Sequence, residues 1–391
     1  MRLKPLALYI HIPFCQHKCI YCDFYSLPLH SLPNGASEIR RQYLESLKKE
    51  FLSYKDRVIE GHEIISIYLG GGTPSILDVS EIKFIKDFIY ENGYVKPGAE
   101  FSIETNPGTA SEEKLRCYLN IGINRISIGV QSLDDRDLKF LSRIHTAGEA
   151  EDIISKAREI GFKNISLDLI FNLPNQTSEK WLYNLKRAVA LPVDHVSAYS
   201  LIVEEETELF RMVQNKQVVI SDSETDSDLY LETIEFLEKN GFYQYEVSNF
   251  AKPGFESIHN NAYWNYSDYL ALGCSSHSFV NGERWWNVRD LHAYVKSVDE
   301  TGTAQSGSEL LSHDQQFEEF IMLRLRCGRL DFAEVEKRFG VDLNNFLKKT
   351  LDQYSAIGLL KFTDGLVTLT PKGFSLADEI ISKFLSEISP R

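Results

Sequence analysis

The sequence predicts an α/β protein: a partial (β/α)6 barrel of the TIM type, followed by an α+β, winged-helix-like domain. Alternation of strands and helices repeats about six times between residues 6 and 202, which predicts a parallel sheet with right-handed crossovers. Polar motifs also follow the predicted strands, where barrels of this kind build their sites. A doubly wound sheet would gather residues in the same way and is the competing arrangement.

The six predicted strands are short, apolar and rich in β-branched residues, as expected for a covered parallel sheet. They span residues 6–13, 64–71, 100–105, 125–132, 165–172 and 195–202. Amphipathic stretches between them predict helices at 38–54, 78–91, 111–121, 147–160 and 178–190. The hydroxyls of Ser111 and Ser178 stand where helix N-caps would be.

The pattern changes after residue 203. The acidic run 221–228 predicts a loop leading into a helix near 226–240, and the polar run 297–308 predicts a linker. Later, Asp364-Gly365 stands between two β-prone runs and predicts a hairpin. We therefore divide the chain into three parts: the barrel over 1–240, an aromatic-rich extension over 241–300 and the winged-helix-like domain over 301–391.

Composition narrows the classes of function. The net charge of −14 argues against non-specific nucleic-acid binding, although a winged-helix-like tail keeps a nucleic-acid-binding regulator as a third hypothesis. No stretch approaches the roughly 18 apolar residues that span a membrane, and the N-terminus lacks a signal-peptide pattern. We expect a cytoplasmic protein, and in a reducing compartment clustered thiols favour metal binding.

Three of the six cysteines stand together in "HIPFCQHKCIYCDFYS", spaced C-x3-C-x2-C. Cys15, Cys19 and Cys22 can hold a soft metal or an iron–sulfur cluster, which normally takes four cysteines. One interpretation is a [4Fe–4S] cluster with one iron open to an external ligand. The other is a zinc site completed by His11 or His17. The spacing favours the cluster because the chain offers no second pair of closely spaced cysteines.

The triad, with Tyr21 before its last cysteine, resembles the radical S-adenosylmethionine (SAM) superfamily. The resemblance implies a barrel of the radical SAM kind and a cluster whose open iron is chelated by SAM. It assigns SAM contacts to residues at the strand ends: Tyr9, Tyr21, Gly71, Gly72, Thr73, Glu104, Gln131, Arg143 and Asp168. The segment "GGGTPS" fails as a phosphate loop because no Gly-Lys-Ser/Thr follows. Asp168, within an apolar strand, needs a partner if buried, and Arg143 is a candidate.

The whole chain resembles the branch around oxygen-independent coproporphyrinogen III dehydrogenase, which also holds a group of haem chaperones. Three features favour the chaperones. Phe24 stands where the dehydrogenase has a fourth cysteine, the N-terminal arm is shorter, and "HNNAYW" (259–264) resembles the H-N-x-x-Y-W motif that the chaperone group ties to haem. The alternative is the dehydrogenase itself, an enzyme that decarboxylates a tetrapyrrole.

The resemblance therefore implies a chaperone that binds haem at His259 and passes it to an unidentified acceptor protein, as a monomer or a dimer. Histidine is a usual axial ligand of haem iron. From the residues alone, one histidine among aromatics is more often part of a core. Cys274 and His277 are secondary candidates for the haem site. The sequence leaves open whether the protein is an enzyme.

Overall fold

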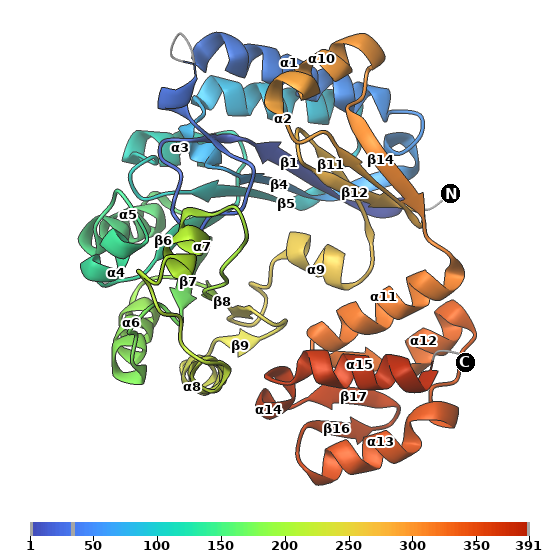
Figure 1. Ribbon diagram of the computed structural model, residues 1–391. Coiled ribbons are helices and arrows are strands. Elements are labelled where there is room, and N and C mark those ends of the chain that lie inside the picture. Colours follow the sequence, from blue (N-terminus) through green and yellow to red (C-terminus); the bar gives the residue numbers. More distant parts are fainter. Residues whose placement is uncertain (1–2, 33–35, 389–391) are drawn as a thin grey trace.

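A computed structural model describes residues 3–32 and 36–388, and a twelve-stranded sheet organises most of the described chain (Figure 1). Its central strands are parallel neighbours in chain order. They are β1 (Lys4–Ile12), β4 (His62–Gly71), β5 (Val95–Thr105), β6 (Arg125–Gln131), β7 (Asn164–Phe171) and β8 (His195–Ser200). A doubly wound sheet reverses its strand order at a switch point, and this run of strands does not. The predicted partial barrel is confirmed.

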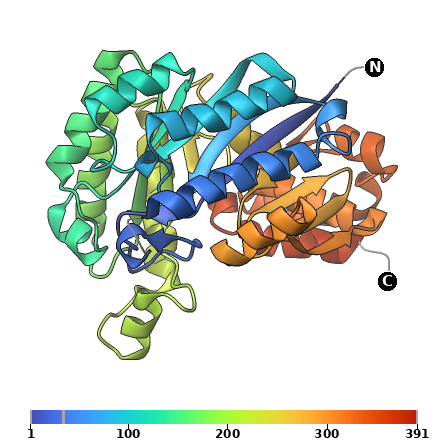
Figure 2. The same ribbon diagram turned by 90° about the horizontal axis from the view of Figure 1, so that it is seen from above.

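Helices cover the outer side of these strands, as Figure 2 shows in blue to green. They are α1 (Ser37–Ser53), α2 (Val79–Asn92), α3 (Glu112–Asn120), α5 (Ala147–Ile160) and α6 (Ser178–Ala190), all predicted, and the short α4 (Asp135–Phe140), which was not. Ser111 caps α3 as predicted, but α6 is capped by Thr177 rather than Ser178. The predicted loop at 221–228 is largely wrong. Helix α8 (Ser223–Lys239) starts within it because Asp222 caps the helix and acidic side chains suit its first turn.

The aromatic-rich segment and the residues that follow it extend the same sheet at both edges. On one side β11 (Asp268–Leu272) pairs with β1, followed by β12 (His277–Val280), β13 (Glu283–Asn287) and β14 (Gln305–Leu310). On the other side β10 (Asn249–Ala251) and β9 (Tyr243–Gln244) continue from β8. The predicted linker 297–308 is wrong, because it forms the end of α10 (Leu291–Thr301) and the edge strand β14. The division at residues 240 and 300 stays a prediction.

Helix α9 (Ile258–Trp264) packs against β1, β4 and β11, between the sheet and the C-terminal elements (Figure 1). The buried carboxylate of Glu100 in β5 anchors its first turn. It accepts hydrogen bonds from Ser257 Oγ at 3.1 Å and from the amides of Ile258 at 3.0 Å and His259 at 3.1 Å. A carboxylate is favourable there because the first amides of a helix lack partners within it.

The C-terminal elements have a hydrophobic core of their own. They are α11 (His313–Arg326), β15 (Arg329–Asp331), α12 (Phe332–Phe339), α13 (Asn344–Ala356), β16 (Leu360–Thr363), β17 (Leu366–Leu369), α14 (Pro371–Phe374) and α15 (Ala377–Ile388). The hairpin turn at Asp364-Gly365 is confirmed, with φ of 53° and 79°, as a type I′ turn requires. Among the described residues, no helix is both long and apolar enough to cross a membrane.

Glu50 of α1 forms hydrogen bonds to three segments that are far from it in the sequence. Its buried carboxylate accepts hydrogen bonds from the Gly273 amide at 2.9 Å, Asn287 Nδ2 at 2.6 Å and the Tyr294 hydroxyl at 2.6 Å. The three donors come from the β11–β12 turn, β13 and α10. Burial raises the pKa of Glu50 from 4.5 to about 7.

We expect Glu50→Ala to lower the free energy of unfolding by about 3 kcal/mol or more, because it leaves three donors without their acceptor. The exposed Glu45→Ala, on the same helix, is the control and should change little. Since the folded pKa of Glu50 lies above its unfolded value, the carboxyl contributes most at low pH. The stability difference between wild type and variant should therefore narrow between about pH 5 and pH 7. Urea unfolding at both pH values measures it, and a constant difference would contradict the raised pKa.

Candidate functional site

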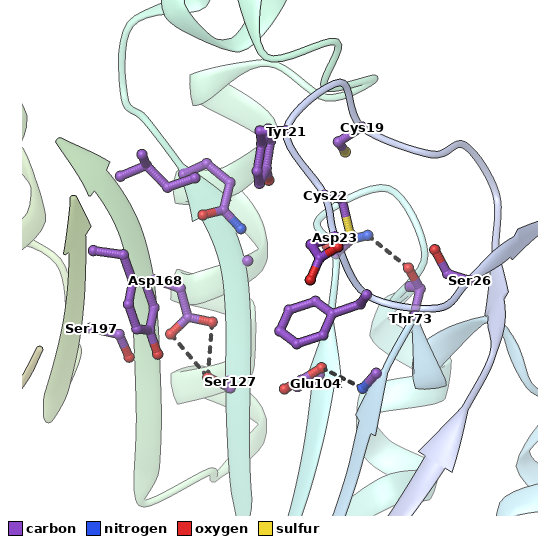
Figure 3. Close-up of a pocket in the computed structure, with 18 of the residues that line it drawn as sticks. Cys19, Tyr21, Cys22, Asp23, Ser26, Thr73, Glu104, Ser127, Asp168 and Ser197 are labelled. Carbon is purple, nitrogen blue, oxygen red and sulfur yellow. Dashed lines mark hydrogen bonds between the residues drawn. The ribbon is translucent and has the colours of Figure 1, made fainter. Parts of the chain in front are cut away.

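A cavity of about 530 Å³ opens at the C-terminal ends of the barrel strands. The cysteine segment, the glycine-rich loop after β4 and the ends of β5 to β8 all line it. Figure 3 shows Cys19, Cys22, Thr73, Glu104 and Asp168 converging on it from different elements. Of the thirteen predicted site residues, Tyr9 and His259 do not line this cavity. The other eleven do: Cys15, Cys19, Tyr21, Cys22, Gly71, Gly72, Thr73, Glu104, Gln131, Arg143 and Asp168.

The cysteine segment is a loop held closed at its base. Strand β2 (Phe14–Cys15) pairs with β3 (Leu27–Pro28), and the Leu27 amide donates to the Pro13 carbonyl at 2.7 Å. Cys15 is buried, whereas Cys19 and Cys22 are half-buried, and all three are free thiols. Burial raises the pKa of the Cys15 thiol and raises that of Cys22 to about 11. Within residues 3–32 and 36–388, no three acidic, histidine or cysteine side chains are close enough to hold one metal ion.

The surroundings of the thiols fit a group that carries anionic sulfur. Arg143 Nη1 lies 3.4 Å from Cys19 Sγ, and the Thr73 hydroxyl donates to Cys15 Sγ at 3.5 Å. Arg143 Nε is buried and has no hydrogen-bond partner in the part of the chain that the structure describes. A guanidinium and a hydroxyl stabilise negative charge on sulfur, so the donor set suits the predicted iron–sulfur cluster.

The glycine-rich loop is fastened to the start of the cysteine segment. The Gly72 amide donates to the Ile12 carbonyl and the Thr73 amide to the Phe14 carbonyl, both at 2.8 Å. A Cβ on Gly72 would lie 2.7 Å from the Phe14 oxygen and 3.1 Å from Cys15 Sγ. The close approach of this backbone to the first cysteine therefore needs glycine.

Two carboxylates stand deeper in the cavity. Glu104 accepts a hydrogen bond from the Tyr68 hydroxyl at 2.9 Å and from the Gly71 amide at 3.2 Å, and burial raises its pKa to about 7. Both oxygens of Asp168 accept from Ser127 Oγ at 3.1 Å (Figure 3), and burial raises its pKa too.

The expected pairing of Asp168 with Arg143 is wrong. Arg143 donates instead to Asn106 Oδ1 at 2.7 Å and to the Gly129 carbonyl. The serine hydroxyls of neighbouring strands already satisfy Asp168, which leaves Arg143 to the cysteine loop.

Tyr9 and His259 lie behind the cavity wall. The Tyr9 hydroxyl is 3.2 Å from His11 Nδ1, and its ring packs on Tyr68. His259 is only 2% exposed, with Nδ1 3.0 Å from Ser66 Oγ and Nε2 2.9 Å from the Tyr263 hydroxyl. Burial lowers the pKa of His259 to about 3. The motif histidine is thus a bonded core residue here, and of its motif only Asn260 lines the cavity.

The secondary haem candidates are not brought together with the cavity. Cys274 is buried near the Tyr43 hydroxyl, and His277 is exposed on β12, stacked on Trp286. Phe24, by contrast, lines the cavity while 66% exposed, so an apolar ring stands at its rim.

The prediction missed polar residues that line the cavity. Five lie on the barrel strands and two outside them, Asn106 after β5 and Asn260 in α9: the strand residues are Arg125, Ser127, His195, Ser197 and Tyr199. A signal for part of this set was present. In "RISIGVQ" every second residue of β6 is polar or glycine, which places Arg125, Ser127, Gly129 and Gln131 on one face.

Two family models match the chain: "Radical SAM superfamily" over residues 9–188 and "HemN C-terminal domain" over 311–376. Curated relatives named "Heme chaperone HemW" match along almost the whole chain. The Bacillus subtilis protein is 34% identical over 98% of this chain and 100% of its own length, and the Escherichia coli protein is 32% identical over 99% and 100%. The Haemophilus influenzae relative is 38% identical over 72% of this chain and 73% of its own.

A solved structure has the same fold. The coproporphyrinogen III oxidase HemN of Escherichia coli, described as a radical SAM enzyme, superposes with a TM-score of 0.83 at 26% identity. The match covers 98% of this chain and 90% of that one. The likeness therefore includes the barrel, the aromatic-rich segment and the C-terminal domain.

We expect Gly72→Ala to lower the iron retained after anaerobic reconstitution to about half of the wild-type value or less, because packed backbone cannot yield to the added Cβ. Gly108→Ala, with nothing within 4 Å of its Cβ, is the matched control at the same end of the barrel. Iron and sulfide analysis of both variants, with thermal unfolding as the test of folding, measures the effect. Wild-type iron content in a folded Gly72→Ala protein would contradict it.

Proposed function

This chain belongs to the HemW family of heme chaperones, a branch of the radical SAM superfamily, and we propose that it binds haem and passes it to an acceptor protein. The observation that carries the proposal is the full-length relationship, which includes the aromatic-rich segment and the C-terminal domain as well as the barrel. The acceptor, the oligomeric state and the cytoplasmic location stay predictions.

We propose further that Cys15, Cys19 and Cys22 hold a [4Fe–4S] cluster. Three thiols around one cavity, with Arg143 and Thr73 beside two of the sulfurs, support this assignment. A bound cluster with SAM supplies one-electron chemistry. The chain's own contribution is to position both groups at the strand ends and to stabilise the negative charge on sulfur.

The strand-end residues are proposed to bind SAM. Gly71, Gly72 and Thr73 present close-packed backbone next to Cys15, and Glu104 and Asp168 offer carboxylates to ammonium or hydroxyl groups. Tyr21, Gln131 and Arg143 line the same cavity. Tyr9 acts from behind this wall, since its ring supports Tyr68, which in turn donates to Glu104.

The haem site is proposed at α9, with His259 as the iron ligand. In this structure both ring nitrogens of His259 are bonded within the fold. Contact with iron therefore requires one ring nitrogen of His259 to exchange its hydrogen bond, to Ser66 or to Tyr263, for the haem iron.

Haem titration of the purified chain tests the proposal. We expect a saturable Soret change in the wild type and binding at least about tenfold weaker in His259→Ala, the effect of losing one good contact. His292→Ala, an exposed histidine on α10, is the control, and His277→Ala tests the secondary candidate. The absence of a saturable Soret change, or a change of the same affinity in His259→Ala, would contradict the assignment of His259 as the iron ligand.

Coproporphyrinogen dehydrogenation is the second candidate, because the solved HemN structure has the same fold. Phe24 separates the two, since a phenyl ring cannot ligate iron at the position of the dehydrogenase's fourth cysteine. We expect reconstituted protein with reductant, SAM and coproporphyrinogen III to form no protoporphyrinogen above background. Product at rates comparable to a dehydrogenase assayed in parallel would overturn the chaperone proposal.

A further inference from the structure

Arg125 is a buried cation at the floor of the cavity. It is the first residue of β6 and only 3% exposed, yet it lines the cavity together with Ser127, Gly129 and Gln131 of the same strand. Gln131, at the other end of the strand, is six residues away, or about 20 Å along an extended chain. The floor around Arg125 is therefore separate from the level of the cysteines, and Asp168 is the proposed SAM contact that lies nearest to it, through Ser127.

The guanidinium forms no ion pair with any described residue. Among the described residues it donates two hydrogen bonds, both from Nη1, to Asn164 Oδ1 at 2.6 Å and to the Phe255 carbonyl at 3.3 Å. A guanidinium has five N–H donors, and buried charges are normally paired. Arg125 thus retains donors on Nε and Nη2 at the cavity wall.

The polar groups around Arg125 already have partners within the protein. His195 lies between Ser166 Oγ at 2.7 Å and the Tyr245 hydroxyl at 2.8 Å, so both of its ring nitrogens are engaged. Glu100, on the neighbouring strand, accepts its bonds from the first turn of α9. Asp168 accepts from serines and influences Arg125 only at longer range. Arg125 is therefore the charged group at this floor that has no close counter-ion among the described residues, and an anionic ligand could supply one.

We propose that Arg125 binds a carboxylate of the ligand at the cavity floor, and that this carboxylate is a propionate arm of haem. Arginine suits carboxylates because its planar fork donates two parallel hydrogen bonds. Asn260 of α9, the helix proposed to take haem, lines the same cavity, so this helix and the cation border one space. The identification of the carboxylate as a propionate rests on the proposed function.

The first test changes the ligand and leaves the protein intact. Haem and haem dimethyl ester, in which both propionates are esterified, are titrated into the wild-type chain. We expect the ester to bind about ten- to a hundredfold more weakly, because it cannot pair with the buried guanidinium. Equal binding of the two overturns the role of Arg125 and leaves the chaperone proposal standing. No binding of haem at all is instead a failure of the proposed function, and the inference falls with it.

The second test changes the cation. In Arg125→Gln we expect haem to bind as weakly as its ester, so the preference for the free acid disappears, and Arg125→Lys should keep part of it. Arg116→Gln, an exposed arginine on α3, is the matched control. Loss of the preference in Lys18→Gln, at the cavity mouth, with its retention in Arg125→Gln would overturn the assignment.

SAM is the other source of a carboxylate, and its binding is measured in the same variants. Unchanged SAM affinity in Arg125→Gln supports the propionate, whereas weakened SAM binding with an unchanged preference for haem over its ester overturns it. Thermal unfolding reports whether Arg125→Gln folds. If it does not fold, the wild-type comparison of haem and ester still tests whether a propionate contributes to binding, and Arg125→Lys tests the cation.

Discussion

Parallel pairing of β1, β4, β5, β6, β7 and β8 in chain order is the constraint on which the rest of the structure depends. It brings the C-terminal ends of six strands to one rim, where segments far apart in sequence meet. Thr73 reaches Cys15, and Arg143 reaches Cys19, only because of that shared rim. The cysteine loop, with two short strands at its base, is positioned by this sheet.

The same pairing forces polar side chains into the barrel. Successive residues of a strand alternate between faces, so β6 directs Arg125, Ser127 and Gln131 toward the cavity. Buried polar groups must find partners. Asp168 accepts from serine hydroxyls and Glu104 from Tyr68. Among the described residues, Arg143 Nε has no hydrogen-bond partner and Arg125 donates through Nη1 alone. This unequal satisfaction makes the cavity a binding site rather than a packed core.

Helix α9 joins the haem motif to that cavity. Glu100 fixes its first turn, His259 stacks on Tyr68, and Tyr68 donates to Glu104 beside the glycine-rich loop. A movement of α9 that exposed His259 would therefore remove the ring that stacks on Tyr68, the hydrogen-bond donor to Glu104. The two proposed ligand sites share a wall, which gives haem loading and SAM binding a physical route to influence each other.

Local pattern was sufficient for much of the fold. Apolar β-branched runs predicted all six barrel strands within a few residues, and Asp364-Gly365 predicted the C-terminal hairpin. Pairing at long range was not readable. The run 297–308 looked like a linker because β14 is a polar strand at the edge of the sheet, and its pairing with β13 is a tertiary contact. The acidic start of α8 looked like a loop because it has few apolar residues. It is helical because the Asp222 cap and the acidic side chains of the first turn favour a helix there.

The sequence by itself determined the strands, the C-x3-C-x2-C spacing, the family resemblance and the presence of Phe24 in place of a fourth cysteine, because each is local along the chain. Only the tertiary structure decided that His259 is bonded within the core, that Arg143 contacts Cys19 rather than Asp168, and that Arg125 lies buried without an ion pair to any described residue. These depend on which residues face each other across the barrel. Strand register and the packing of α9 set which residues face each other, and no single segment of the sequence determines either of them.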